Sequence, residues 1–341
     1  MAPHPLNNRD MSENSLPVRL ADVSVVIPAY NAAGFIIDAL QSITRQTLFP
    51  QEVIVIDDGS SDATYQVVHD WKQKENLPFT LHLQKQANKG LPATRNVGIL
   101  QATGQWIALL DADDIWEPVH LQQLVAAVAL RPSAVAAYGA GRLLVGDSIN
   151  PQAYDDFWDN PSKKYGQKID GSACLLVNSD IFPRLIQGNF IKPSSLMFAK
   201  TVGGKTMLFD ENLRTAEDRE FLVRMVFLGE FVYDPTPITQ YRWHDDNISQ
   251  GKNAKRNMEN GMRALKVIFN NPALGLGGRD RAACHAQVRA SAKEYLYICG
   301  QRGWSEYRSG LAFIYAQFGL AKALGALNPK HIVRSLVSRG P

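Results

Sequence analysis

The sequence predicts an α/β fold: a mostly parallel, Rossmann-like sheet flanked by helices, followed by a helical C-terminal extension. Three observations predict it. Short apolar runs rich in Val and Ile alternate with stretches whose apolar residues have helical spacing, as in strand–helix–strand units. Clusters of Asp, Asn and Pro follow these runs, and open parallel sheets bind ligands at that edge. The C-terminal residues show helical patterns only.

The first two strands are expected at 23–30 and 53–56. VSVVIPAY is a near-continuous β-branched run that Pro28 ends, and VIVI is a second such run, as in strands buried on both faces. Between them, residues 34–46 carry apolar side chains at helical spacing. Asp62 can cap the helix that follows the second strand.

The next elements continue the alternation. Residues 79–84 alternate as a third strand, residues 90–100 form a helix that tolerates Pro92 in its first turn, and residues 105–110 form a fourth strand. Because strands and helices alternate at this pitch, the sheet is expected to be parallel.

Three polar clusters follow three of the expected strands. They are PAYN after the first, DD after the second and DADD after the fourth. Any one of them is ordinary turn chemistry, since Asp, Asn and Pro are common in turns. Three clusters at equivalent strand ends instead indicate a ligand site along one edge of the sheet.

The DADD cluster places Asp111, Asp113 and Asp114 directly after an apolar run. Carboxylates this close disfavour each other's ionised forms, so the cluster is expected to hold a cation. The sequence has no Walker loop and no GxGxxG after the first strand, and therefore lacks a glycine-rich phosphate cradle. Mg²⁺ or Mn²⁺ bound by one or two carboxylates and by substrate phosphates would replace it.

Four segments in order carry a resemblance: VSVVIPAYN, VIVIDDGSSD, NKGLPATRNVGILQATGQWIALLDADD and AEDREFLVRM. Over residues 22–250 the sequence resembles inverting family 2 glycosyltransferases with the GT-A fold, of the bacterial surface-polysaccharide type. The resemblance implies a metal-dependent enzyme that uses Mn²⁺ or Mg²⁺ at a DXD motif. It would move a sugar from a nucleotide-sugar, with a UDP-sugar as the expected donor, to a hydroxyl of a glycan or lipid-linked saccharide.

By the same resemblance, the base of the donor would lie in a pocket shaped by the backbone of Pro28 and Ala29. Tyr30 would stack on the base, and Asp58 would accept a hydrogen bond from its imide N–H. Arg95 would face the nucleotide-sugar.

The remaining implied roles concern the metal and the acceptor. Asp111 would contact the ribose side of the donor, and Asp113 would ligate the metal with Asp114 in support. His244 matches a histidine that contacts the diphosphate or the metal. In AED the second acid is the general base, which points to Asp218, with Glu217 beside it.

Two other functions stay open on the residues alone. A sugar nucleotidyltransferase also combines an α/β sheet with metal-binding carboxylates, but it normally needs a glycine-rich, basic loop after the first strand. A non-catalytic nucleotide-sugar-binding module would bind the donor without turnover.

The net charge of +3 is unevenly distributed, and it suggests how the chain is organised. Residues 251–341 contain 15 Lys and Arg against 4 Asp and Glu, a balance of +11, whereas the preceding residues carry −8. Such asymmetry indicates an anionic partner for the basic part. The expected organisation is a flexible leader (1–20), a glycosyltransferase domain with a nucleotide-sugar half (21–140) and an acceptor half (141–250), and a basic helical region (251–341).

The basic region allows two interpretations. Residues 311–327 are strongly apolar but are interrupted by Gln317 and Lys322, and a membrane span needs about 20 apolar residues. One interpretation is a helix lying in the headgroup region of an anionic membrane, with nearby Trp304, Tyr307, Arg308, Lys330 and Arg334. The other is a packing appendage with a solvated basic face. No nucleic-acid partner is expected.

The compartment follows from the cysteines and the leader. Cys174, Cys284 and Cys299 are odd in number and lack CxxC spacing, so they are expected to be buried thiols in a reducing cytoplasm. Residues 1–20 lack the apolar run of a signal peptide. The expected location is cytoplasmic, with peripheral attachment to the inner face of the cytoplasmic membrane if the basic region binds lipid.

Overall fold

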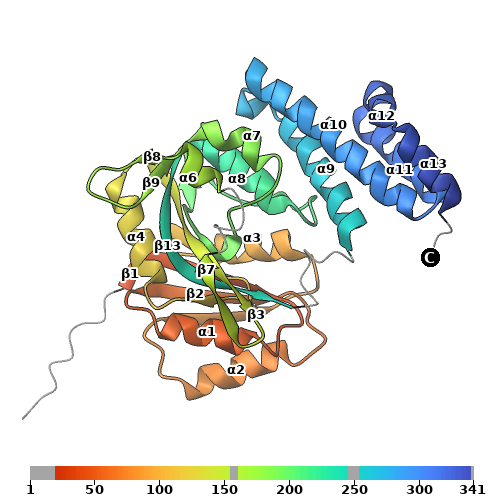
Figure 1. Cartoon of the computed structure of the whole chain (residues 1–341). Coiled ribbons are helices and arrows are strands. Elements are labelled where there is room, and N and C mark those ends of the chain that lie inside the picture. The colour runs from red at the N-terminus through yellow and green to blue at the C-terminus, as the bar shows by residue number, and fades with distance from the viewer. Residues whose placement is uncertain (1–19, 154–159, 245–252, 339–341) are drawn as a thin grey trace, which may run out of the picture.

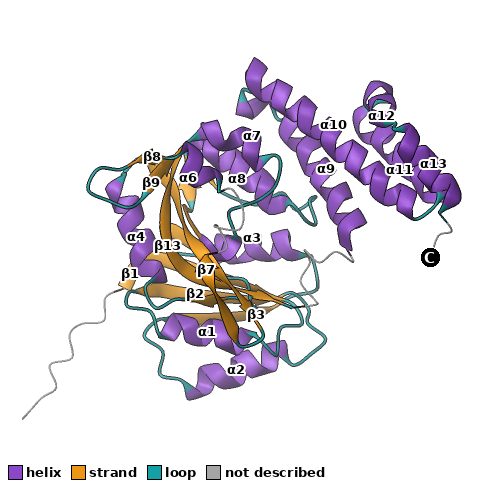
Figure 2. Ribbon diagram, viewed as in Figure 1, coloured by secondary structure: helices purple, strands orange, loops and turns teal. Residues whose placement is uncertain are grey.

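The structure, a computed structural model, describes residues 20–153, 160–244 and 253–338. All but the last residue of the expected leader lies outside them. In these parts of the chain a large mixed sheet carries helices on both faces, and a helical region extends from one side of it (Figures 1 and 2). The predicted α/β architecture with a helical C-terminal extension is confirmed.

The main path of the sheet runs β3-β2-β1-β4-β10-β6-β13-β9-β8, with β5 paired to β13 and β7 paired to β6. Strands β1 to β4 are parallel, β10 is antiparallel to both β4 and β6, and β13 runs parallel to β6. The strands of this sheet are β1 (Leu20–Ala29), β2 (Phe49–Asp57), β3 (Thr80–Lys85), β4 (Trp106–Leu109), β5 (Ile115–Trp116), β6 (Ala134–Val145), β7 (Ser148–Ala153), β8 (Gln167–Lys168), β9 (Leu175–Val177), β10 (Leu196–Ala199) and β13 (Glu230–Trp243). A separate hairpin pairs β11 (Thr201–Val202) with β12 (Lys205–Thr206).

The helices alternate with the strands in the first half of the chain and follow one another in the last part. The helices are α1 (Ile36–Thr44), α2 (Thr64–Lys74), α3 (Leu91–Gln101), α4 (His120–Leu130), α6 (Pro161–Tyr165), α7 (Phe182–Leu185), α8 (Glu217–Leu228), α9 (Ala254–Asn270), α10 (Gly278–Gln301), α11 (Trp304–Phe318), α12 (Leu320–Ala326) and α13 (Pro329–Val337). Asp62 accepts the backbone N–H of Thr64 at 2.9 Å, but the N-cap position of α2 is Ala63, so the expected cap lies one residue too early.

Alternate residues of the central strands pack on opposite faces of the sheet, because successive side chains of a strand point to opposite sides. Val25 and Val53 join a core covered by α1, α2 and α4. Val26 and Ile54 join the other core, to which α3, α7 and α8 contribute. Full burial of each such side chain contributes roughly 1.5–3 kcal/mol, which explains the β-branched runs of the sequence.

Helix α3 lies unusually close to β1, and a glycine allows it. A Cβ at Gly98 would lie 2.5 Å from Cγ1 of Val26, closer than real carbon atoms approach. The small residue therefore fixes the depth of α3 against the sheet. Arg95, three residues before Gly98 in α3, is positioned by the same contact.

The C-terminal helices are anchored to the sheet domain at one end and form their own core at the other. Leu265 of α9 and Val288 of α10 belong to the core shared with α8. Farther along, Tyr295, Leu296 and Ile314 form a separate cluster with α11 and α12. The expected domain boundary near residue 250 stays a prediction.

One expected feature of the C-terminal region is wrong. Residues 311–327 are not one helix, because Gly319 has a φ of +83° and ends α11 before α12 begins. In the described parts of the chain, no helix is long and apolar enough to cross a membrane. The three cysteines are buried and free, as expected.

Candidate active site

The carboxyl ends of four strands meet at one edge of the sheet. Strands β1, β2 and β4 are parallel neighbours, so the three predicted polar clusters lie together. Strand β13 runs in the same direction through β10 and β6, and it brings His244 to this edge. No local pattern in the sequence predicts β13, and only the family resemblance indicates a site role for His244.

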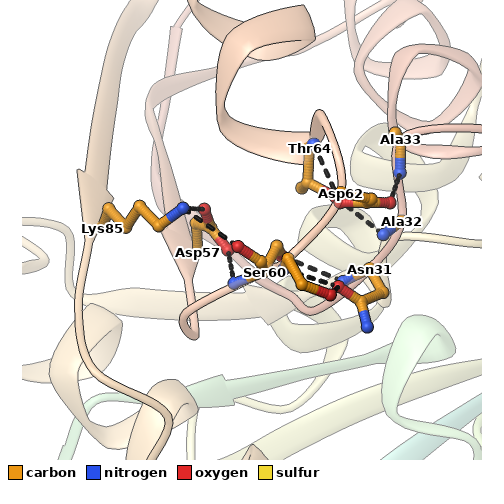
Figure 3. Close-up of polar contacts among 9 residues, drawn as sticks. Asn31, Ala32, Ala33, Asp57, Ser60, Asp62, Thr64 and Lys85 are labelled. Carbon is orange, nitrogen blue, oxygen red and sulfur yellow. Dashed lines mark hydrogen bonds and ion pairs between the residues drawn. The ribbon is translucent and has the colours of Figure 1, made fainter.

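The loops after β1 and β2 hold each other in place (Figure 3). Asn31 donates its backbone N–H to Oγ of Ser60 at 2.9 Å, Ala32 donates to Oγ1 of Thr64 at 2.8 Å, and Ala33 donates to Asp62 at 3.1 Å. Side chains of one loop thus accept the free N–H groups of the other. The bend that these bonds fix, with Asn31 at a φ of +50°, leaves the preceding Tyr30 55% exposed.

Asp58 is buried and organises the loop that leads into α3. One carboxylate oxygen accepts from Gln86 Nε2 and from the backbone N–H of Lys89, and the other accepts from the backbone N–H of Gly90, each at 2.8 Å. Its own N–H donates to the carbonyl of Ala29 at 2.8 Å. An ionised carboxylate has about four acceptor sites, so a fourth donor, such as an imide N–H, can be accommodated.

The DADD cluster is held by a serine from a distant part of the chain. Ser194 accepts the backbone N–H of Asp111 at 3.0 Å and donates to Oδ2 of Asp114 at 2.5 Å. Asp114 is 1% exposed and serves as the anchor of the loop. Asp111 and Asp113 keep 25% and 29% of their side chains exposed. Ser194 lies in a short turn (Pro193–Ser195) directly before β10, and nothing in the local sequence indicates these anchoring bonds.

The cluster is electrostatically unfavourable without a cation. Burial, and then the charge of Asp111, raise the pKa of Asp113. Burial, and then the charges of Asp113 and Asp111, raise the pKa of Asp114 well above its usual range. Since an opposite charge within a few ångströms favours the ionised form, a divalent cation would relieve both.

Asp113 and His244 together fit such a cation. Oδ2 of Asp113 lies 3.0 Å from Nε2 of His244, which is about the separation of two neighbouring ligands in an octahedral Mg²⁺ site with bonds of roughly 2.0–2.1 Å. Among the described residues no three His, Cys, Asp or Glu side chains form a metal-binding group. The chain would thus supply two ligands there, and phosphates and water would complete the set.

Two residues that sequence reasoning missed hold His244 in position. Its ring stacks on Phe35, with centroids 4.7 Å apart, so Phe35 is not simply part of the apolar face of α1. Arg242 donates from Nε to the carbonyl of Asp113 at 2.9 Å and from its backbone N–H to Asp114 at 3.0 Å. The end of β13 is thereby tied to the DADD loop.

Arg95 connects Asp111 of the DADD cluster to Glu217 of α8. Its side chain is 1% exposed and donates to Asp111 and to Glu217, both at 2.8 Å. These two carboxylates raise the pKa of Arg95 despite its burial. Its two terminal nitrogens therefore bind protein carboxylates; that Arg95 faces the nucleotide-sugar stays a prediction.

The two acids at the start of α8 have different environments. Glu217 is 4% exposed, and burial, followed by the charge of Asp218, raises its pKa to about 7 even though Arg95 opposes the shift. Asp218 is half-buried and accepts from Asn189 Nδ2 at 2.5 Å. Ala216, just before them, has a φ of +64°, a left-handed conformation that strains a non-glycine residue and is frequent at functional sites.

Sequence comparisons identify related proteins. Residues 24–176 match the family model described as "Glycosyl transferase family 2". EpsH of Bacillus subtilis (strain 168), which carries a glycosyltransferase name, is 28% identical over 243 residues, covering 70% of this chain and 66% of EpsH. An uncharacterized glycosyltransferase of Haemophilus influenzae is 26% identical over 240 residues, covering 69% of each chain. This chain thus spans about two thirds of the length of these relatives.

Structural comparisons identify the same fold. The S. aureus TarS 1-349 complex with UDP aligns with a TM-score of 0.53 and 16% identity, covering 92% of this chain and 88% of TarS 1-349. The mannosyltransferase PcManGT from Pyrobaculum calidifontis, in complex with GDP-Man and Mn²⁺, aligns with a TM-score of 0.55 and 18% identity, covering 91% and 87%. At these identities the likeness shows a shared fold alone.

Proposed function

From the match of residues 24–176 to the model described as "Glycosyl transferase family 2", we propose that the chain is a metal-dependent inverting glycosyltransferase. It moves a sugar from a nucleotide-sugar, with a UDP-sugar as donor, to a hydroxyl of a glycan or lipid-linked saccharide. The building of bacterial polysaccharides is the process we assign to it.

The observation that carries the proposal is the group formed by Asp111, Asp113 and His244. These side chains come from two strands that end at one edge of the sheet, and Asp113 meets His244 at 3.0 Å. Mn²⁺ or Mg²⁺ bound there would stabilise the negative charge that develops on the leaving nucleoside diphosphate. Tyr30, exposed at the end of β1, offers a face on which the base can stack.

Asp218 is the group that we assign as general base. A base must reach the hydroxyl whose proton it removes, and Glu217 is too deeply buried against Arg95 to do so. Asp218 keeps partial exposure while Asn189 fixes its orientation. Asp218 removes the proton of the acceptor hydroxyl, the oxygen attacks the anomeric carbon, and the bond to the nucleoside diphosphate breaks on the opposite face, so the configuration inverts.

We place the acceptor beside the segment 189–195. Phe190, Lys192 and Ser195 of this segment line, with Tyr241, a cavity that has room for about one water and is too small for a sugar, so the placement rests on what else the segment holds. The same segment holds other groups of the site, because Asn189 binds Asp218 and Ser194 binds the DADD loop. The Nζ atom of Lys192 lies 4.8 Å from the ring centroid of Tyr241. One face of the Tyr241 ring is therefore occupied by Lys192.

The test is donor turnover with and without metal. The purified chain, with Mn²⁺ and a panel of nucleotide-sugars, should release nucleoside diphosphate from at least one donor, and excess chelator should abolish the release. Asp113→Ala should lose turnover and metal-dependent thermal stabilisation by the donor, because a bound ligand stabilises only the folded state. Full activity in excess chelator would contradict metal dependence, and binding without any turnover would indicate a non-catalytic module.

A further inference from the structure

The two last helices expose their apolar residues and bury their small ones. In α12, Leu320 and Leu324 are 60% and 56% exposed, and Leu327, just after the helix, is 37% exposed, whereas Ala323 and Ala326 are buried. A surface helix of a globular protein ordinarily turns its large apolar side chains inward. In α12 this order is reversed.

Helix α13 repeats the reversal. Val333, Leu336 and Val337 are 62%, 63% and 73% exposed, and they lie at positions i, i+3 and i+4, which share one face of a helix. Ser335, by contrast, is buried. Both helices contact α10, so the packed sides of the helices are already used, and the outward apolar stripes need another partner.

The charges around these stripes have one sign. Lys330 and Arg334 line an open groove on α13 together with Pro329, Val333 and Val337. After Glu306 the sequence contains five Lys or Arg and no Asp or Glu. A surface that combines exposed Leu and Val with basic residues only is complementary to an anionic, partly apolar partner.

We propose that the outward face of α12 and α13, made by Leu320, Leu324, Leu327, Val333, Leu336 and Val337 with Lys330 and Arg334, docks on an anionic lipid bilayer. The apolar side chains enter the boundary between headgroups and acyl chains, and the two basic residues contact lipid phosphates. A second copy of this chain is a poorer partner, because the same face would meet basic residues with no carboxylate to pair with them.

The structure changes which residues are expected at the lipid. Tyr307, which the sequence placed in the headgroup region, is 1% exposed and belongs to the core of the C-terminal helices. The docking face lies at the end of the molecule farthest from the parallel strands (Figure 1). Substitutions there leave the candidate active site intact, and the inference does not depend on the proposed function.

The test is flotation of the full chain with lipid vesicles. Wild-type protein should float with vesicles containing phosphatidylglycerol and far less with pure phosphatidylcholine. Val333→Asn with Leu336→Asn should weaken binding more than tenfold. Lys330→Gln should weaken it about fivefold, and adding Arg334→Gln about fivefold again, with smaller effects at high salt.

Controls separate the docking face from general charge and from misfolding. Lys72→Gln with Lys74→Gln removes the same charge from α2, on the opposite side of the molecule (Figure 1), and should float like the wild type. All variants should keep the wild-type melting temperature, since the changed side chains are exposed or, at Lys72, only half-buried. Equal flotation of the α13 variants and the wild type, or no flotation of the wild type, would overturn the proposal. A dimer that Val333→Asn with Leu336→Asn dissociates, without lipid binding, would make a second copy the partner.

Discussion

Replacing Arg95 by Met should destabilise the protein strongly, because Arg95 neutralises a carboxylate that water cannot reach. The pair with Glu217 is 2.8 Å long and both side chains are nearly inaccessible. Removing one partner of a buried pair costs about 3–5 kcal/mol. The pair with Asp111, which is 25% exposed, adds less than about 1 kcal/mol. Because Glu217 can take up a proton, its pKa being raised to about 7, we expect a loss of about 3 kcal/mol at pH 8 and less at pH 5.

Urea denaturation of four proteins measures this bridge: wild type, Arg95→Met, Glu217→Gln and the double variant. The double variant should recover at least 1 kcal/mol relative to the sum of the single losses, since Glu217→Gln removes the buried charge that Arg95→Met leaves unpaired, while Asp111 is 25% exposed. Arg131→Met is a matched control, because Arg131 also pairs with a glutamate at 2.8 Å but is 47% exposed; its effect should be small. A loss below 1 kcal/mol for Arg95→Met, or a double variant no more stable than simple addition predicts, would refute the reasoning.

Three further predictions concern the chemistry and the pH response of the site. The Asp218→Asn variant should bind donor normally, while its rate of sugar transfer falls on the order of 10²–10⁴-fold. The Glu217→Gln variant should lose less of the transfer rate. If a transfer assay gives the reverse order, Glu217 is the base. UDP should displace a bound donor better than GDP does, and Tyr30→Ala should weaken UDP binding; tighter GDP binding by calorimetry would contradict the uridine pocket. Burial raises the pKa of Glu217 from 4.5 to about 7, so the folded state holds a proton that the unfolded state releases, and stability should fall between about pH 4.5 and 7 by about 2–3 kcal/mol. Urea midpoints of Glu217→Gln should lack this decline, and an unchanged pH profile in that variant would show that Glu217 is not responsible.

The half of the sheet that carries the donor clusters could be predicted from local sequence. The expected strands at 23–30, 53–56, 79–84 and 105–110 correspond to β1 to β4 within a few residues. Buried parallel strands need continuous apolar runs, and such runs are visible without any knowledge of their neighbours. The convergence of Tyr30, Asp58 and the DADD cluster then follows from parallel pairing alone.

The support of the site could not be predicted in this way, because it depends on contacts between distant parts of the chain. Ser194 anchors Asp114 across 80 residues, and Arg242 reaches Asp113 across 129 residues. Neither a serine before a strand nor an arginine in a strand has a local signature of this role. Asn189 is a similar case, since nothing in its own surroundings indicates that it binds Asp218.

The acids of the site occur in two pairs, and in each pair one acid is structural while the other stays accessible. In DADD, Asp114 is buried and bonded to Ser194, while its neighbour Asp113 keeps 29% of its side chain exposed. At the start of α8, Glu217 is buried against Arg95, while Asp218 is half-buried. In each pair one carboxylate fixes the loop or helix end, and the other is left accessible to a cation or a proton. A single acid at either place could not do both, because the hydrogen bonds that hold it would occupy the oxygens that the chemistry needs. The raised pKa values of Asp114 and Glu217 are the electrostatic cost of that arrangement; Arg95 offsets part of it, and the cation that we propose would offset the rest.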